Sequence, residues 1–354
     1  MTSETEDGAS DLATTADDGR SPLREEPLSF TAARDRFSEA LERRLMASVS
    51  GDGVLFEAGR YHLETGGKRL RGLLPPWVAH NLTLVRPDRS RVVEDALVLG
   101  VALELIHNGT LVHDDVQDGD TLRRGRPTVW VRYGMPQAVN LGTTLLLLGV
   151  QQVVGARRGH EIIGDINLAI LDIVAGQALE FELQTHDGPT TAMWERMAAG
   201  KTGALFSACF LGAVHAAGLP SADLREAARF GSRLGVFFQL QDDLLDLVGD
   251  KQRDVPATDI AEGKISWPVA WACERRSGPS AAAIERMLES VRAPRAATSL
   301  AMIHEALGLL HEVGAIRAGL DRVAQLGAEL TAHPLSRSSP GLVERVLDPI
   351  RHAL

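Results

Sequence analysis

The sequence predicts an all-α fold. Aromatic residues make up only 5% of the 354 residues, whereas strands favour aromatic and β-branched side chains. From Ala33 onward, apolar residues recur at helical spacing, as in the stripe Phe37, Leu41 and Leu45. No segment alternates cleanly between apolar and polar residues, and no internal repeat is present. We therefore expect one helical domain.

The beginning of the chain differs in composition from the rest. Residues 1–27 are mostly Ser, Thr, Gly, Asp and Glu, so we expect a disordered acidic tail followed by a helical domain over 28–354. The formal net charge of −10 argues against general nucleic-acid binding. No signal peptide is visible, and Cys209 and Cys273 lie in apolar surroundings without metal-ligand spacing. These features predict a cytoplasmic protein with reduced cysteines.

The individual helices follow from apolar periodicity, and their ends follow from turn chemistry. After the first stripe, the predicted helices cover 73–84, 92–118, 136–155, 161–184, 194–217, 222–248, 266–273, 281–291, 299–326 and 341–352. The clearest breaks are Thr65-Gly66-Gly67, Arg124-Gly125-Arg126-Pro127, His186-Asp187-Gly188-Pro189 and Ser338-Ser339-Pro340. Gly and Pro mark these breaks because both favour backbone conformations that end a helix.

One predicted helix has the composition of a membrane span. Residues 133–156 carry no charge and are long enough to cross a bilayer. The segment nevertheless contains Asn140, Gln151 and Gln152, together with several Gly and Thr. We therefore predict a buried core helix here and no transmembrane segment.

Two Asp-Asp-x-x-Asp clusters lie in apolar helical stretches. Carboxylates this crowded repel one another and are driven toward protonation unless a cation keeps them ionised. At about 100° per residue of helix, each cluster and one upstream polar residue fall within an arc of about 100°. The two stripes are His107, Asp114, Asp115 and Asp118, and Gln239, Asp242, Asp243 and Asp246. If they face each other across a cavity, they can hold hard divalent cations, which in turn hold a polyphosphate.

Short basic elements accompany the acidic clusters. They are Gly66-Gly67-Lys68-Arg69-Leu70-Arg71, Arg123-Arg124-Gly125-Arg126-Pro127, Lys201-Thr202-Gly203 and Gly263-Lys264. A single basic run is usually a solvated face. Beside two aspartate clusters, however, these elements suit an enzyme with two diphosphate substrates. Metal ions can neutralise one diphosphate, while Arg and Lys bind the other directly.

The ordered set of motifs resembles the trans-isoprenyl diphosphate synthase (polyprenyl synthetase) family, and within it the geranylgeranyl diphosphate synthases. The matching segments are 66–71, 105–118, 123–127, Gly176-Gln177, 201–203, 238–246 and Glu262-Gly263-Lys264. They occur in family order, and the resemblance covers nearly everything after about residue 30. It implies a single-domain bundle of antiparallel helices around a deep central cavity, usually in a homodimer.

The resemblance also implies roles for the site residues. Mg²⁺, three ions with substrate bound, would be held by Asp114, Asp118 and Asp242, with support from Asp115, Asp243 and Asp246. The allylic diphosphate on these metals would also bind Arg123, Lys201 and Lys264. Isopentenyl diphosphate would bind Lys68, Arg71, His107 and Arg124. Thr202 and Gln239 would lie beside the reacting carbons.

The same resemblance bears on product length. In this family the growing tail runs along the helix before the first cluster, where bulky residues stop elongation. Gly109 and Thr110 occupy those positions here, and both are small. At about 1.5 Å per residue they lie roughly 6–8 Å from Asp114 along the helix. We therefore expect a product longer than farnesyl diphosphate, with geranylgeranyl diphosphate as the first expectation.

Two other functions stay open. A class I terpene cyclase would keep the metal clusters but would have no use for the isopentenyl diphosphate residues, all of which are present. A non-catalytic partner subunit of another synthase would tend to lose an aspartate cluster, and this chain keeps both. One departure from the family pattern is the absence of a lysine shortly before Thr258-Asp259.

Overall fold

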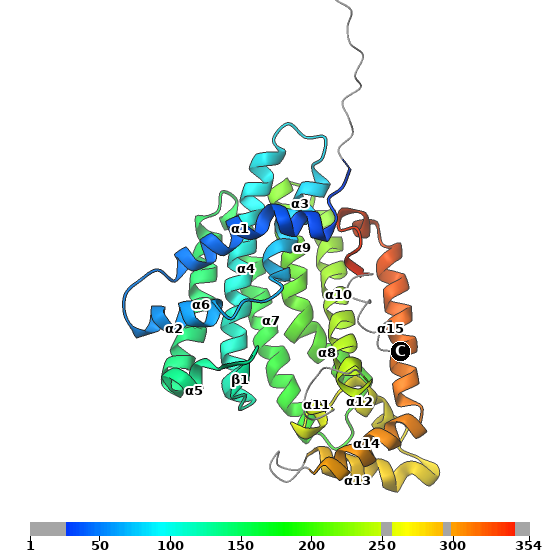
Figure 1. Cartoon of the computed structure of the whole chain (residues 1–354). Helices are drawn as coiled ribbons and strands as arrows, with labels where there is room; N and C mark the ends of the chain where they lie inside the picture. The colour runs from blue at the N-terminus through cyan, green and yellow to red at the C-terminus, as the bar shows by residue number, and fades with distance from the viewer. Residues whose placement is uncertain (1–25, 249–256, 293–298, 344–354) are drawn as a thin grey trace, which may run out of the picture.

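Helices packed side by side form the centre of the protein (Figure 1). The computed structural model describes residues 26–248, 257–292 and 299–343. Its central helices are α4 (Arg89–Gln117), α6 (Met135–Gly155), α7 (Gly159–Thr185), α9 (Ala204–Ala217) and α10 (Ser221–Val248). Short connections join α6 to α7 and α9 to α10. The predicted all-α fold is confirmed.

Further elements surround this centre. They are α1 (Phe30–Ser48), α2 (Val54–Leu63), α3 (Leu70–Leu82), α5 (Val129–Tyr133), α8 (Thr191–Ala198), α11 (Thr258–Ala261), α12 (Trp267–Glu274), α13 (Ala281–Val291), α14 (Leu300–Glu312), α15 (Ala315–Ala332), the 3₁₀ turns η2 (Gly278–Ser280) and η4 (Pro334–Ser338), and the strands β1 (Leu122–Arg123) and β2 (Arg126–Pro127).

The structure differs from the prediction at several helix boundaries. Helix α2 has no counterpart among the predicted helices, and the predicted helix over 299–326 is divided into α14 and α15 at Gly314, whose φ is 80°. This left-handed conformation ends a helix and is readily adopted by glycine. The predicted acidic tail lies outside the described residues except for 26 and 27, and the predicted helix over 341–352 lies outside them except for 341–343.

Helix α4 is apolar around most of its circumference, and it is buried accordingly. Leu103, Leu105 and Ile106 are each at most 1% exposed, on successive sides of the helix. The helix ends at Gln117, just before Gly119 with a φ of 70°. The first aspartate cluster therefore occupies the last turn of a buried helix.

A proline inside α3 leaves a backbone carbonyl oxygen free to accept a hydrogen bond from α9. Because Pro75 has no backbone N–H, the carbonyl oxygen of Arg71 lacks its helical donor. The Cys209 thiol donates to this oxygen at 3.4 Å. Cys209 and Cys273 are both buried and free, as predicted.

A small hairpin follows the first aspartate cluster. Leu122 pairs with Pro127 and Arg123 with Arg126, so Arg124 and Gly125 form a two-residue turn. Their φ angles of 53° and 74° are both positive, as a type I′ turn requires. Strands this short leave no alternation to detect, which is why periodicity did not predict them.

A π-helical turn, η1 (Ala199–Gly203), joins α8 to α9. Such turns insert an extra residue into a helix and are frequent at functional sites. Gly176 of α7 lies against this turn, and a Cβ atom there would be 2.1 Å from the backbone nitrogen of Lys201. Lys201 and Thr202 are thus carried on an irregular turn held closely against α7.

Helices α6 and α7 each bury only one face. Large apolar side chains are exposed on both, namely Met135, Val139, Leu147 and Val154 on α6, and Leu168, Leu171, Val174 and Phe181 on α7. The prediction of a buried core helix over 133–156 is therefore wrong for one face of α6. The absence of charge in a helical segment predicts that the helix is buried. It does not indicate whether the residues that bury it belong to the same chain.

By length and composition alone, four described helical segments could cross a membrane. They are Arg89–Gln117, Met135–Gly155, Gly159–Thr185 and Thr191–Ala217. The most apolar windows of the first and last are 72% buried in the protein, so their composition is accounted for by the core. The corresponding windows of α6 and α7 are only 33% buried.

Candidate active site

The two aspartate clusters face one cavity of about 280 Å³. Asp114 and Asp118 come from the end of α4, and Asp242 and Asp243 come from the end of α10. The charged groups in the wall are the carboxyls of Asp114, Asp118, Asp120, Glu180, Asp242, Asp243, Asp259 and Glu262 and the cations of Arg123, Lys201 and Lys264. The structure thus brings together residues far apart in sequence that the two acidic stripes predicted.

Burial in this cavity shifts the pKa values of some of its acids. Burial raises the pKa of Asp114 to about 6; Lys201 opposes the increase and Asp118 adds to it. Burial likewise raises the pKa of Asp243 to about 7, against hydrogen bonds from Trp267 and Gln239. Both groups hold their protons more tightly than in water. A cation in the cavity would favour their ionised forms.

Each of the three cations predicted for the allylic diphosphate is paired with a carboxylate. The Arg123 Nε donates to Asp115 Oδ1 at 2.6 Å, and the Lys264 Nζ donates to Asp118 Oδ2 at 3.0 Å. Lys201 is paired with Glu180. Asp115 itself is 1% exposed, so its contribution is to orient Arg123.

Asp246 fastens the next segment of the chain to α10. Its carboxylate accepts from the Thr258 hydroxyl at 2.7 Å and from the backbone N–H of Asp259 at 2.9 Å. Burial acts to lower the pKa of Lys264 a few residues later, but Asp118 and other carboxylates outweigh it and raise that pKa. Lys264 therefore stays charged at the cavity wall.

A chain of hydrogen bonds links the π turn to the second cluster. The Thr202 hydroxyl donates to Gln239 Oε1 at 2.9 Å, and Gln239 Nε2 donates to Asp243 Oδ1 at 3.1 Å. The backbone N–H of Trp267 donates to the other oxygen of Asp243 at 2.9 Å. Thr202 and Gln239, predicted to lie beside the reacting carbons, are therefore in direct contact.

The residues predicted for isopentenyl diphosphate form a second, basic group. Burial lowers the pKa of His107 well below its usual value, and the positive charges of Arg71 and Arg124 add to this effect. The neutral ring can therefore accept from Arg71, whose Nη1 lies 3.3 Å from His107 Nε2. Arg124 donates to the carbonyl oxygen of Gly66, and Lys68 in the same glycine turn is exposed.

The hairpin places consecutive arginines in the two groups. Arg123 reaches Asp115 beside the acidic cavity, whereas Arg124 reaches the glycine turn that carries Lys68. One structural element therefore connects the acidic and the basic group.

Glu180 and Tyr61 are among the residues that the sequence did not reveal as part of the site. Glu180 of α7 lines the acidic cavity, and its signal in the sequence was a carboxylate one helical turn after Gly176. Tyr61 is 6% exposed, and its hydroxyl donates to the carbonyl oxygen of Pro127 at 2.7 Å. The guanidinium carbons of Arg126 and Arg132 lie 4.3 and 4.2 Å from its ring centroid, so Tyr61 anchors the hairpin.

A largely apolar cavity of about 240 Å³ adjoins the acidic one. It lies between α4, α6 and α7, and Asp114 belongs to the walls of both cavities. Thr110 lines it, together with Leu146, Ile173 and Gln177. Gly109 does not; a Cβ atom there would lie 2.8 Å from the carbonyl oxygen of Gly142, against α6. Of the two predicted chain-length positions, only Thr110 is therefore at the cavity wall.

The donor chemistry of the acidic cavity fits a hard divalent cation. Its acids supply oxygen ligands, which Mg²⁺ prefers, and no Cys or His is found among the described residues that line it. Among the described residues, no three such side chains already converge on one point. Mg²⁺ usually keeps several waters and binds through one or two carboxylates plus substrate phosphates, so a preformed cage is not required.

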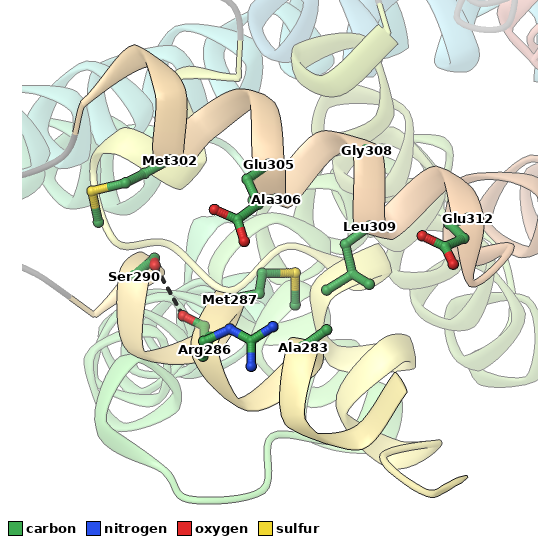
Figure 2. A pocket seen from close by; sticks show the side chains of 10 residues that line it. All are labelled: Ala283, Arg286, Met287, Ser290, Met302, Glu305, Ala306, Gly308, Leu309 and Glu312. Carbon is green, nitrogen blue, oxygen red and sulfur yellow. Dashed lines mark hydrogen bonds between the residues drawn. The ribbon is translucent and has the colours of Figure 1, made fainter. Parts of the chain in front are cut away.

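A further cavity of about 410 Å³ lies away from these residues, between α13 and α14 (Figure 2). Met287 and Leu309 line it, and Arg286, Glu305 and Glu312 carry its charges. It shares no residue with the acidic or the apolar cavity. It therefore belongs to neither part of the candidate site.

The chain is similar to known proteins. A family model described as polyprenyl synthetase matches residues 52–307. The chain is 35% identical over 233 residues to a short chain isoprenyl diphosphate synthase of Methanocaldococcus jannaschii, covering 64% of this chain and 68% of that one. It is 38% identical over 225 residues to a geranylgeranyl diphosphate synthase of Sulfolobus acidocaldarius, covering 61% and 66%.

Solved structures show the same likeness. A polyprenyl synthase of Caulobacter crescentus, described as complexed with calcium and isoprenyl diphosphate, superposes with a TM-score of 0.74 at 26% identity. The superposition covers 89% of this chain and 94% of the other.

Proposed function

The chain belongs to the polyprenyl synthetase family and is a prenyltransferase, and on that premise we propose that it extends an allylic prenyl diphosphate with isopentenyl diphosphate to give geranylgeranyl diphosphate. The observation that carries this proposal is the pairing of an acidic cavity with a separate basic group, connected by the hairpin of Arg123 and Arg124. Such a pairing suits two diphosphates bound in different ways.

We propose that Asp114, Asp118 and Asp242 hold Mg²⁺, three ions when substrate is bound. Bound Mg²⁺ would neutralise the diphosphate of the allylic substrate and so make it a better leaving group. Arg123, Lys201 and Lys264 add fixed positive charge at the same wall, where negative charge develops as the carbon–oxygen bond breaks. Asp115 orients Arg123, while Asp243 and Asp246 hold the neighbouring Gln239 and the segment before Lys264.

The basic group would hold the second substrate. Lys68, Arg71 and Arg124 supply charge-assisted donors for isopentenyl diphosphate, and the neutral His107 keeps Arg71 in place. The allylic carbon–oxygen bond breaks, and the diphosphate leaves with the electron pair. The allylic carbon then bonds to the double bond of isopentenyl diphosphate, and the resulting cation loses one proton to the released diphosphate. The Thr202–Gln239 pair offers oxygen atoms beside the developing cation. Holding both substrates makes the step effectively unimolecular.

The apolar cavity provides a place for the tail. It begins at Asp114, where the allylic diphosphate would be held, and Thr110 leaves its α4 wall open. Each buried methylene contributes about 0.8 kcal/mol, so elongation continues until a wall stops it. This supports a product longer than farnesyl diphosphate.

We also propose that the protein is a cytoplasmic homodimer without a transmembrane segment or a nucleic-acid partner. The exposed apolar face of α6 and α7 supports the dimer, because a contiguous apolar surface marks an interaction site. The net charge of −10 argues against nucleic acid as the partner.

Product analysis tests the function. The protein is incubated with Mg²⁺, isopentenyl diphosphate and each allylic diphosphate in turn, and the products are sized by chromatography. We expect extension that requires both substrates and stops in excess EDTA. Cyclisation of a prenyl diphosphate without isopentenyl diphosphate would establish the terpene cyclase instead. Activity that appears only with a second synthase would establish the partner subunit.

A further inference from the structure

The apolar cavity between α4, α6 and α7 is open along one side. Val174, Ala178 and Phe181 form part of its wall, at helical spacing on one stripe of α7. Val174 is nevertheless 58% exposed and Phe181 36% exposed. An apolar tail in this cavity would therefore contact water on the side where these residues lie.

These wall residues also belong to the exposed apolar face. Leu171, one turn before Val174, is 64% exposed, and Leu147 of α6, next to the cavity residue Leu146, is also 64% exposed. The face continues along α6 from Met135 to Val154, a segment without a charged residue. Whatever covers this face must also cover the open side of the cavity.

The size of the face fits a second copy of the chain. From Met135 to Val154 it is about 29 Å long at 1.5 Å per residue. Two helices about 10 Å apart make it roughly 20 Å wide, which gives an area on the order of 600 Å². A standard interface buries about 800 Å² per partner, and a two-fold pair presents the same patch on both sides.

We infer that the second copy closes the side of the tail cavity, so that each catalytic unit needs its partner to bury a long prenyl chain. This inference rests on the proposed prenyl transfer. It goes beyond dimerisation, because it makes tail binding and product length depend on the oligomeric state. The dependence is reciprocal: a long-tailed ligand that prefers the dimer must strengthen the dimer by the same factor.

The test uses exposed residues outside both cavity walls. Leu147→Glu and Leu171→Glu place charges on the face, and Val85→Glu, at a residue 88% exposed between α3 and α4, is the matched control. Sedimentation equilibrium gives the oligomeric state, and circular dichroism checks helicity. We expect the two face variants to be helical monomers and the control to remain a dimer.

The monomers should then bind long tails poorly. Leaving about two methylene groups in water corresponds to roughly tenfold weaker binding, so KM for the longest allylic substrate should rise about tenfold. Products should become shorter, while KM for isopentenyl diphosphate should stay unchanged. Dilution of the wild-type protein below its dimer Kd should have the same effect without a substitution.

A measurement without catalysis separates this inference from the proposed function. A non-hydrolysable allylic thiolodiphosphate with a 15-carbon tail should strengthen wild-type dimerisation about tenfold, and inorganic diphosphate should not. If the protein extends no substrate, the proposed function fails, and this linkage still decides the inference. The inference is overturned if the face variants remain dimeric or if the monomers give unchanged products. It is also overturned if the tail does not strengthen the dimer, or if the wild-type protein is a monomer that binds phosphatidylglycerol vesicles through this face.

Discussion

Replacing Asp114 with Asn should stabilise the metal-free protein at pH 8 while it abolishes turnover. Burial raises the pKa of Asp114 to about 6 from an ordinary 3.8. A carboxyl with a raised pKa in the folded state contributes stability below its unfolded pKa, and this contribution is lost as the pH rises through the folded pKa. The variant does not titrate here, so it avoids the loss.

The magnitude follows from the two pKa values. The difference between about 6 and 3.8 corresponds to about 3 kcal/mol at 1.36 kcal/mol per pH unit. Water in the cavity screens the charge, so we expect about 1–3 kcal/mol at pH 8 and about half of that at pH 5. For a protein of this size the gain corresponds to about 1–4 °C in Tm.

Urea unfolding in excess EDTA at both pH values measures this effect. Asp35→Asn, at an exposed carboxylate on α1, is the matched control and should change little at either pH. With Mg²⁺ and diphosphate present, the wild type should become more stable than the Asp114→Asn variant, since ligand binding stabilises the wild type and not the variant. A variant that is less stable at pH 8 in EDTA, or equally altered at both pH values, would refute the reasoning. Turnover at the wild-type rate would refute the role of Asp114 in metal binding.

Three further predictions follow from the site and its support. Lys68→Ala and Arg71→Ala should raise KM for isopentenyl diphosphate about tenfold to a hundredfold in steady-state assays, because a charge-assisted contact is worth roughly 1.5–3 kcal/mol; an equal rise for the allylic substrate would contradict the separate basic group. Thr110→Phe should shorten the product toward farnesyl diphosphate by placing a ring in the apolar cavity, and unchanged chromatograms would mean that another wall sets the length. Gly176→Ala should lower the free energy of unfolding by about 1–3 kcal/mol and reduce turnover, because its Cβ would meet the backbone of Lys201. An unaltered urea midpoint would show that the π turn can shift to accommodate the Cβ atom.

The sequence alone determined the fold class, because helical periodicity is a local property. Apolar residues at spacings of three and four predict a helix whatever it packs against. The same reasoning identified the aspartate stripes, since one turn of helix brings their members onto one side. Local turn chemistry predicted the connections between helices less completely. It located the break at Arg124-Gly125 but not the type I′ hairpin, which depends on pairing between Arg123 and Arg126.

Only the tertiary structure decided which faces meet. The ends of α4 and α10 share a cavity because long-range packing aligns those helices, and no local spacing encodes that alignment. Glu180 and Tyr61 acquired their places in the same way, through α7 and α2. The small size of Gly109 and Thr110 could be read from the sequence, but only packing put Thr110 at the cavity and Gly109 against α6. Periodicity predicted an apolar α6. Which of its sides the chain itself covers depends on neighbours distant in sequence, and the structure leaves one side exposed.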